Sequence, residues 1–329
     1  MAYKNKKLGA FIVPTGIGAS IGGYAGDAAP YARKFSKYTR LIVNPNVVNA
    51  GGFSGITNTM LYTEGYSLDS FFKDEINLIP SENNKIGIIY DKAIPKDVLS
   101  IHINTQNAVR AVYGVNILEY TITDEEVGVE FYITEDGIST GNIKNIKTLD
   151  RACQTLLSKG CEAIAVVCFF EEPEEDNPAY SSGEGVDPVG GVEAVISHYI
   201  SKVYNIPCAH SPAFADYVIS PDPVNPKSAS EYITPTFLPC ILLGLSNAPK
   251  ITRNKNLGIN INNLDFLVMP HDCLGSIPVI ESVKRGIPVY AIIENKTELN
   301  ITKAKLFPDT ESIIEVETYD KCLKMILKS

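Results

Sequence analysis

The sequence predicts an α/β protein with a mainly parallel sheet, or two such sheets, flanked by helices. Apolar runs rich in Val and Ile are continuous rather than alternating, which is typical of strands covered on both faces. Segments with apolar residues at helical spacing lie between these runs, so strands and helices alternate along the chain. This alternation indicates parallel strands joined by right-handed crossovers.

The expected elements follow one another in chain order. Strands are predicted at Leu8–Val13, Leu41–Val43, Ile86–Tyr90, Ala163–Phe170, Phe266–Met269 and Val289–Ile293. Helices are predicted at Ala28–Ser36, Lys96–Tyr113, Leu149–Leu157, Val192–Tyr204 and Ile277–Arg285. Gly160 and Gly286 fall just past two of these helices, where a left-handed residue commonly ends a helix.

Two segments break the alternation. Ile117–Thr123 and Val127–Thr134 are predicted to form one β-hairpin, joined by residues 124–126. The segment Glu171–Asp187 is acidic, rich in Gly and Pro, and reads as an irregular loop beside a site or in solvent.

The length of 329 residues allows one large unit, 1–329, or two lobes. The weakest stretch, Glu135–Lys147, would divide the chain into lobes 1–140 and 141–329.

Composition excludes several classes of protein. The net charge is −9 and no basic cluster is present, which argues against a nucleic-acid partner. No apolar run reaches the roughly 18 residues of a membrane span, and the first residues do not fit a signal peptide. We therefore expect a cytosolic protein with no membrane partner. The seven cysteines, an odd number without close pairs, fit reduced thiols in such a compartment. A homo-oligomer is compatible with this composition and charge.

A glycine-rich loop follows the first strand and precedes the first helix. Its glycines Gly16, Gly18, Gly22 and Gly23 could bring backbone N–H groups close to an anionic ligand. The alternative is a tight turn packed against a neighbour. The spacing departs from the dinucleotide fingerprint, and the second strand ends in Asn44-Pro45-Asn46 instead of an acidic residue. A nicotinamide-dependent oxidoreductase is therefore a disfavoured alternative.

Polar residues also gather where other predicted strands end. Asn44, Asn46 and Asn49 follow the second strand, and Asn295 follows the strand at Val289–Ile293. The carboxyl edge of a parallel sheet is where α/β proteins bind ligands, so these amides are candidate ligand contacts. They are equally suited to turns without a function.

Acid–base candidates lie in three later clusters. The turn Gly190-Gly191, whose backbone N–H groups are also candidate ligand contacts, opens a helix that carries Glu193 and His198, and Asp187 precedes it. His210 and the ligand candidate Ser211 end a short strand, and histidine is readily tuned for proton transfer near neutral pH. For each side chain the plain alternative is a cap or a hydrogen-bonded core residue. Two ligands such as Cys208 and His210 do not make a metal site, so none is predicted.

Cys273 lies close to the start of the helix at Ile277–Arg285, where a thiol pKa can fall. It is an outside candidate for a nucleophile or proton carrier; the alternative is a small buried hydrophobe. The combined catalytic candidates are His210, Glu193, Asp187, Cys273 and His198.

Several long motifs carry a family resemblance. They are TGIGASIGGYAGDAAP, NPNVVNA, EGYSLD, GVDPVGGVEAVISH, IPCAHSPA, TFLPCILLGLSNAP and IPVYAIIENKT. With these the chain resembles the domain-of-unknown-function family 3326 of bacteria, cyanobacteria and plants, from about Gly9 to the C-terminus. The resemblance implies a single full-length family domain and supplies no reaction.

The residues themselves favour an enzyme of small-molecule metabolism. Its substrate would be a small carboxylate or phosphate, and isomerase, racemase or lyase chemistry would need only opposed acid and base groups. The rival hypothesis is a non-catalytic metabolite or nucleotide sensor that uses the same glycine loops. No motif names a cofactor.

Overall fold

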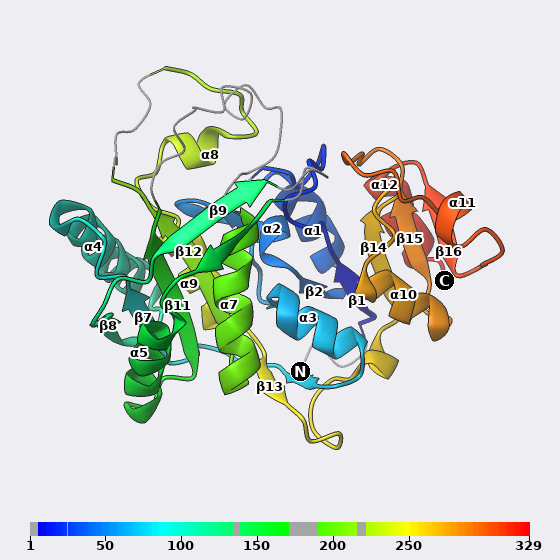
Figure 1. Cartoon of the computed structure of the whole chain (residues 1–329). Helices are drawn as coiled ribbons and strands as arrows, with labels where there is room; N and C mark the ends of the chain where they lie inside the picture. The colour runs from blue at the N-terminus through cyan, green and yellow to red at the C-terminus, as the bar shows by residue number, and fades with distance from the viewer. Residues whose placement is uncertain (1–5, 25, 134–138, 171–189, 216–221) are drawn as a thin grey trace.

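The structure is a computed structural model that describes residues 6–24, 26–133, 139–170, 190–215 and 222–329. Most of its strands belong to two separate parallel sheets, of six and of four strands, and helices flank both (Figure 1). The predicted α/β class with mainly parallel sheets is confirmed.

The six-stranded sheet is built from both ends of the chain. Its order is β16 (Ile313–Val316), β15 (Val289–Ile292), β14 (Phe266–Pro270), β1 (Leu8–Phe11), β2 (Arg40–Val43) and β5 (Met60–Tyr62), with every neighbouring pair parallel. Numbered along the chain, this is the doubly wound order 3-2-1-4-5-6. The order reverses between β1 and β14, so the loops after these two strands diverge and open a crevice.

The four-stranded sheet comes from the middle of the chain. Its order is β12 (Cys208–Ala213), β11 (Ala163–Phe169), β7 (Ile86–Tyr90) and β8 (Ile117–Ile122), again with parallel neighbours. The order here reverses between β7 and β11. That point is closed by the Asp91 carboxylate, which accepts the backbone N–H groups of Ala93, Val127 and Phe169 at 3.1–3.2 Å. The open crevice therefore belongs to the six-stranded sheet.

Helices connect the strands of both sheets. They are α1 (Ala29–Ser36), α2 (Pro45–Val48), α3 (Gly65–Phe72), α4 (Lys96–Tyr113), α5 (Ile146–Ser158), α7 (Gly190–Tyr204), α8 (Ala229–Tyr232), α9 (Leu238–Ser246), α10 (Ile277–Lys284), α11 (Lys303–Leu306) and α12 (Tyr319–Ile326). The five predicted helices are confirmed within a few residues. Gly160 and Gly286 have φ of +89° and +69°, so both take the left-handed conformation expected after a helix.

Short antiparallel pairs complete the fold. They are β3 (Asn49–Ala50) with β4 (Phe53–Ser54), β6 (Asn77–Ile79) with β13 (Lys250–Thr252), and β9 (Val129–Ile133) with β10 (Ser139–Ile143). A 3₁₀ turn, Ile261–Asn263, precedes β14.

The predicted pairing of Ile117–Thr123 with Val127–Thr134 in one hairpin is wrong. β8 joins β7 in the four-stranded sheet, and β9 pairs with β10 instead. The segment between β8 and β9 is not a tight turn, because the Arg151 guanidinium of α5 holds the Asp124 carboxylate at 2.6 and 2.8 Å. That contact draws the segment towards α5 and separates the two strands.

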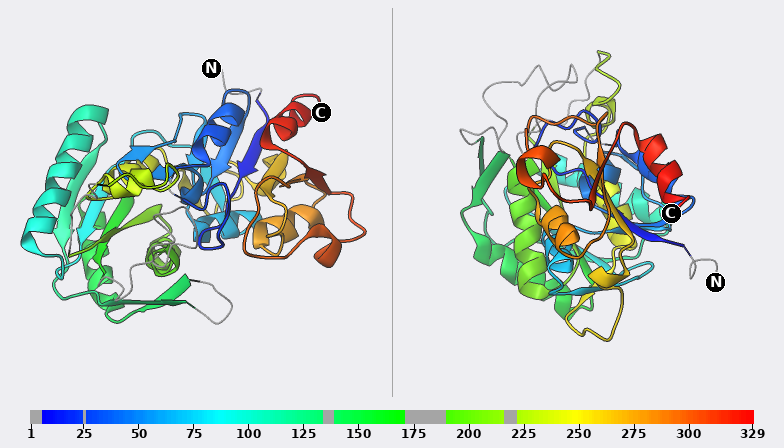
Figure 2. Two further views of the ribbon diagram at one scale, coloured as in Figure 1. Left: turned by 90° about the horizontal axis from the view of Figure 1, so that it is seen from above. Right: turned by 90° about the vertical axis from the view of Figure 1, so that its right-hand side faces the viewer.

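The two sheets do not correspond to the predicted lobes 1–140 and 141–329. Residues 86–213 supply the four-stranded sheet, and the six-stranded sheet takes strands from both sides of that stretch. The first view of Figure 2 shows a first lobe, which contains both chain ends, beside a second lobe formed by the middle of the chain. The arrangement results from β14 pairing with β1, a long-range contact that local composition does not encode.

A continuous core joins the two lobes. One cluster of buried side chains includes Phe11 and Tyr62 from the first lobe, Tyr90 from the second, and Ile241 of α9. Helix α9 is almost wholly apolar and packs closely: a Cβ at Gly244 would lie 2.6 Å from the Tyr62 ring. Because this helix contacts both lobes, it fixes the space between them.

Candidate functional site

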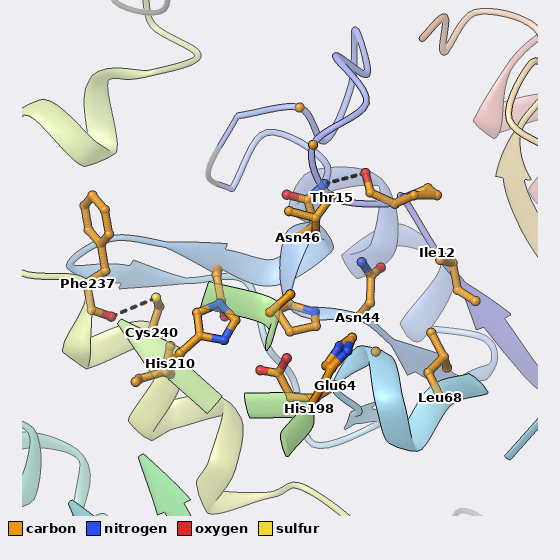
Figure 3. A pocket seen from close by; sticks show the side chains of 18 of the residues that line it. Ile12, Thr15, Asn44, Asn46, Glu64, Leu68, His198, His210, Phe237 and Cys240 are labelled. Atoms are coloured by element: carbon orange, nitrogen blue, oxygen red, sulfur yellow. Dashed lines mark hydrogen bonds between the residues drawn. The ribbon is translucent and has the colours of Figure 1, made fainter. Parts of the chain in front are cut away.

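A cavity of about 360 Å³ lies where the two lobes meet. It opens beyond the carboxyl ends of β1, β2 and β5, and β12, α7 and α9 close its other side (Figure 3). Its lining includes the residues Asn44, Asn46, Asn49, Glu64, Asp69, His198, His210, Glu231, Phe237, Cys240 and Ser276. The cavity therefore lies at the open switch point of the six-stranded sheet, where doubly wound proteins bind ligands.

Glu64 is the most perturbed acid in this cavity. It follows β5 and is the residue just before α3, and its side chain is buried. Burial raises the pKa of the Glu64 carboxyl to about 8, although hydrogen bonds from the Tyr62 and Ser197 hydroxyls pull it down. The Tyr62 hydroxyl donates to Glu64 Oε1 at 3.0 Å. At pH 7 the Glu64 carboxyl is therefore mostly protonated.

Two histidines face the same cavity. His210 Nδ1 lies 2.9 Å from the Ser197 hydroxyl. Burial, together with the neighbouring His198, lowers the pKa of His210 to about 3, and burial also lowers the pKa of His198. Both imidazoles are thus neutral at pH 7. Figure 3 shows Glu64, His198 and His210 grouped on one side of the cavity.

Ser197 connects Glu64 of the first lobe to His210 of the second. Its hydroxyl contacts His210 and lowers the pKa of Glu64, and it also donates to the Ala194 carbonyl at 3.2 Å. The side chain is fully buried, so it cannot reach a ligand. Its role in this arrangement is to position the two titratable groups.

The beginnings of three helices also face the cavity. Gly65 begins α3, Phe237 precedes α9 and Ser276 precedes α10; all three residues line the cavity. No side chain caps the first N–H groups of α3 and α10. At the start of α9, by contrast, the Leu238 N–H donates to Thr236 Oγ1 at 3.1 Å and the Cys240 N–H donates to the Gly51 carbonyl at 3.3 Å. Uncapped helix N-termini present free N–H donors and a positive partial charge. They counter the carboxyls of the lining, which in the described chain contains no Lys or Arg.

The glycine-rich loop contributes less to the cavity than its sequence predicts. Of its four predicted contacts, only Gly16 and Gly23 line it. A Cβ at Gly22, where φ is +88°, would lie 2.8 Å from Val13, and a Cβ at Gly18 would lie 2.5 Å from Glu298. These two glycines are explained by close packing against neighbouring side chains, which agrees with the alternative of a tight turn packed against a neighbour.

Asparagines hold this loop in place. Asn44 accepts the Val13 N–H at 3.1 Å and donates to the Val13 carbonyl at 2.7 Å. Asn46 donates to the carbonyls of Val13 and Pro14, both at 3.2 Å, and to that of Gly22. Both amides face the cavity, but their hydrogen bonds go to the backbone.

Asn295 lies outside the cavity lining. It accepts the Ile21 N–H at 3.0 Å and donates to the Ile21 carbonyl and the Tyr319 hydroxyl. Asn49 does line the cavity, and it donates to the Tyr62 hydroxyl at 3.2 Å. Of the four predicted asparagines, Asn295 is thus a purely structural clamp in the described chain.

Cys273 is placed away from the cavity. It is buried in the core of the six-stranded sheet, donates to the Pro270 carbonyl at 3.5 Å, and its pKa is raised by burial. A nucleophilic cysteine needs a lowered pKa and access to substrate, so this geometry gives the covalent hypothesis no support. Ser211 is likewise buried, and its hydroxyl donates to the Pro212 carbonyl.

The remaining predicted residues belong to the start of α7. Gly190 and Gly191 form its first turn, and Ala194, one turn on, lines the cavity. Asp187 and the side chain of Glu193 lie outside the described residues.

Sequence reasoning missed Glu64, Tyr62 and Asp69. Tyr62 ends β5 and Glu64 follows it, but this strand has only three residues, so no apolar run marked it. The available signal was Glu64-Gly65, a carboxyl and a glycine between an apolar triplet and a helix. Burial also raises the pKa of Asp69, which lines the cavity one turn along α3.

The strand order of the six-stranded sheet raises the question of a dinucleotide, and the residues do not fit one. The Asp27 carboxyl accepts the Gly22 N–H at 2.7 Å near the start of α1, where the pyrophosphate would bind. Asn44, at the position of the ribose-binding acid, is engaged with Val13. Among the described residues, no three His, Cys, Asp or Glu side chains are grouped to hold a metal ion.

Comparison with known proteins places the chain in a family. Residues 9–328 match the family model described as "Protein of unknown function (DUF3326)". The chain belongs to this DUF3326 family. The resemblance seen in its motifs is confirmed, and the match spans both lobes of the DUF3326 fold. No solved structure matches the chain.

A curated relative of this DUF3326 protein is an "uncharacterized lipoprotein" of Synechococcus sp. It is 38% identical over 305 residues, which cover 90% of this chain and 84% of the relative. A cytosolic protein was expected from the sequence, and the name of this relative contradicts that expectation. In the part of the chain that the structure describes, no helix is long and apolar enough to cross a membrane.

Proposed function

We propose that this DUF3326 protein is an acid–base enzyme of small-molecule metabolism, of isomerase, racemase or lyase type. The observation that supports the proposal is the Glu64–Ser197–His210 connection beside the cavity. Burial keeps the carboxyl of Glu64 protonated and the imidazole of His210 neutral at the same pH. Two groups whose pKa values are displaced in opposite directions are typical of a paired proton donor and acceptor.

In this mechanism Glu64 donates a proton to the substrate, and His210 or His198 accepts one. Tyr62 and Ser197 orient Glu64, and Ser197 also fixes the His210 ring through Nδ1. Such paired proton transfers interconvert or cleave small metabolites without further chemistry from the protein.

The substrate class is a small anion, with a carboxylate favoured over a phosphate. The helix N-termini at Gly65 and Ser276 supply N–H donors for a negative group. Asp69 and Glu231 share the same cavity, and without a Lys or Arg in the described lining a dianion would meet more repulsion than a monoanion. The volume of about 360 Å³ fits a molecule of metabolite size.

Hydrogen exchange with solvent tests the proposal without knowledge of the net reaction. The protein is incubated in D₂O with a panel of 2-hydroxy, 2-amino and dicarboxylic acids and sugar phosphates, and deuterium at carbon is read by NMR. We expect exchange in one carboxylate class, and we expect Glu64→Gln and His210→Gln each to reduce its rate at least 100-fold.

Matched control variants are Glu82→Gln, at an exposed glutamate, and His271→Gln, outside the cavity lining. Both should exchange at the wild-type rate. If a ligand from the panel stabilises the protein against heat and no member of the panel exchanges, the site binds without catalysis and the sensor hypothesis replaces the enzyme. Exchange that survives both cavity substitutions would exclude the assigned residues.

A further inference from the structure

Strand β8 ends the four-stranded sheet on the side away from the cavity. The sheet order is β12-β11-β7-β8, so within the described part of the chain one edge of β8 is paired and the other is open. Figure 1 places β8 and α4 at the outer end of the molecule, far from the six-stranded sheet. Among the described residues, β7 is the strand that pairs with β8.

Large apolar side chains are exposed on one face of this edge strand. Leu118, Tyr120 and Ile122 alternate along β8 and are 42%, 37% and 44% exposed. Residues two apart in a strand point to the same face, and the Tyr120 ring meets Tyr90 edge-on at 5.7 Å. Tyr113, at the end of α4, adds a fourth exposed apolar side chain at 60%. Such a patch on an edge strand is unusual in a monomer.

The free edge presents main-chain hydrogen-bonding groups in register with that patch. The Thr123 N–H donates to the Tyr90 carbonyl, so Thr123 and, by alternation, Thr121 and Glu119 face β7. The N–H and C=O groups of residues 118, 120 and 122 therefore point outward. Glu119 Oε1 meets the Tyr120 N–H at 3.0 Å in an exposed contact that a partner strand would replace.

We propose that β8 pairs with β8 of a second copy of this chain, across a two-fold axis at Tyr120, to form a continuous eight-stranded sheet. Two-fold symmetry makes the pairing antiparallel and places Tyr120 opposite the same residue of the copy. Leu118 then lies opposite Ile122 of the copy, and the three pairs exchange about six main-chain hydrogen bonds.

The sequence of β8 is complementary to itself in this register. Each apolar residue meets an apolar residue, and Glu119 meets Thr121, so no like charges face one another. Glu119 is already paired with Lys159 of its own chain at 3.1 Å. Proline and lysine, which usually protect an exposed edge from pairing, are absent from Ile117–Ile122. This self-complementarity is the reason to assign the surface to a second copy.

Sedimentation of the full chain tests the interface. We expect the wild type to sediment as a dimer at 50 μM and Tyr120→Lys to sediment as a monomer with unchanged circular dichroism. The matched control is Tyr38→Lys, since Tyr38 is 54% exposed in the other lobe, and it should remain dimeric. A wild type that is monomeric at 200 μM, or a folded Tyr120→Lys dimer, overturns the proposal.

Disulfide trapping tests the register and does not depend on disrupting the strand. Residues at the centre of the pairing have Cα atoms about 5.5 Å apart, within the range of a disulfide, so Tyr120→Cys should crosslink under mild oxidation. Leu118→Cys should not, because two copies of residue 118 would be about 14 Å apart. The seven native cysteines are buried and free, so they give no background. Crosslinking of Leu118→Cys without Tyr120→Cys would refute the register.

Discussion

Replacing Glu64 with Gln tests the electrostatics of the cavity through stability alone. Glutamine has the shape of the protonated carboxyl and keeps the oxygen that accepts from Tyr62. It removes only the ability to ionise. The variant should therefore lose the proposed catalytic activity and yet be more stable than the wild type at alkaline pH.

The magnitude follows from the displaced pKa. In the unfolded chain Glu64 loses its proton near 4.5, whereas in the folded protein it does so near 8. Ionisation therefore favours the unfolded state as the pH rises between these values, and the penalty is complete above pH 8. At about 1.4 kcal/mol per pH unit the penalty reaches about 5 kcal/mol, of which about 4 kcal/mol falls between pH 5 and pH 9.

The assay is urea unfolding at pH 5, 7 and 9, followed by far-UV circular dichroism because the chain has no Trp. The free energy of unfolding of Glu64→Gln minus that of the wild type should increase by about 4 kcal/mol over this range. All other titrating groups are common to both proteins and cancel in the difference. The exposed Glu82→Gln should show no such increase.

Two results would refute the reasoning. If the stability difference between Glu64→Gln and the wild type stays within about 1 kcal/mol from pH 5 to pH 9, the carboxyl ionises freely in the folded protein. A parallel increase in Glu82→Gln would trace the effect to overall charge instead of burial.

Three further substitutions check other parts of the structure. Asn44→Ala leaves the buried N–H and C=O of Val13 without partners, so unfolding by urea should cost about 2–4 kcal/mol less; a change under 1 kcal/mol would contradict the clamp. Burial lowers the pKa of His102 to about 4, so as the pH falls from 6.5 this histidine binds a proton in the unfolded chain before it does so in the folded protein. The wild type therefore loses stability between pH 6.5 and pH 4. The His102→Gln variant should lose about 3 kcal/mol less than the wild type over this range. Gly65→Ala would place a Cβ 2.5 Å from His198 Nε2, so solvent exchange into the substrate should slow at least tenfold while the melting temperature changes little; an unchanged rate would exclude His198 from the site.

Most individual elements could be predicted from the sequence, because a strand that is buried on both faces is a continuous run of apolar residues. Ile86–Tyr90 and Ala163–Phe169 are continuous apolar runs, and α4 matches its predicted bounds at both ends. The strand β5 has only three residues, which is too short to form such a run. The hairpin was misassigned because Asp124 is held by Arg151, a contact 27 residues apart in the chain.

The candidate site was predicted only in part. His198 and His210 do meet in one cavity, as the ends of separate elements suggested. Glu64 was not singled out, because a glutamate becomes notable only when the folded structure buries it. Cys273 looked available from its position before a helix, but its thiol points into the core.

The positions of most helices and strands were determined by the sequence alone, because apolar spacing, helix-end signals and glycines act over a few residues. The assignment of strands to two sheets, the insertion of one lobe into the other and the protonation of Glu64 were decided only in three dimensions. They depend on the pairing of β14 with β1, whose residues are about 250 positions apart, and on side chains that exclude water around Glu64. Desolvation is a property of the assembled surroundings, so no single stretch of sequence encodes it.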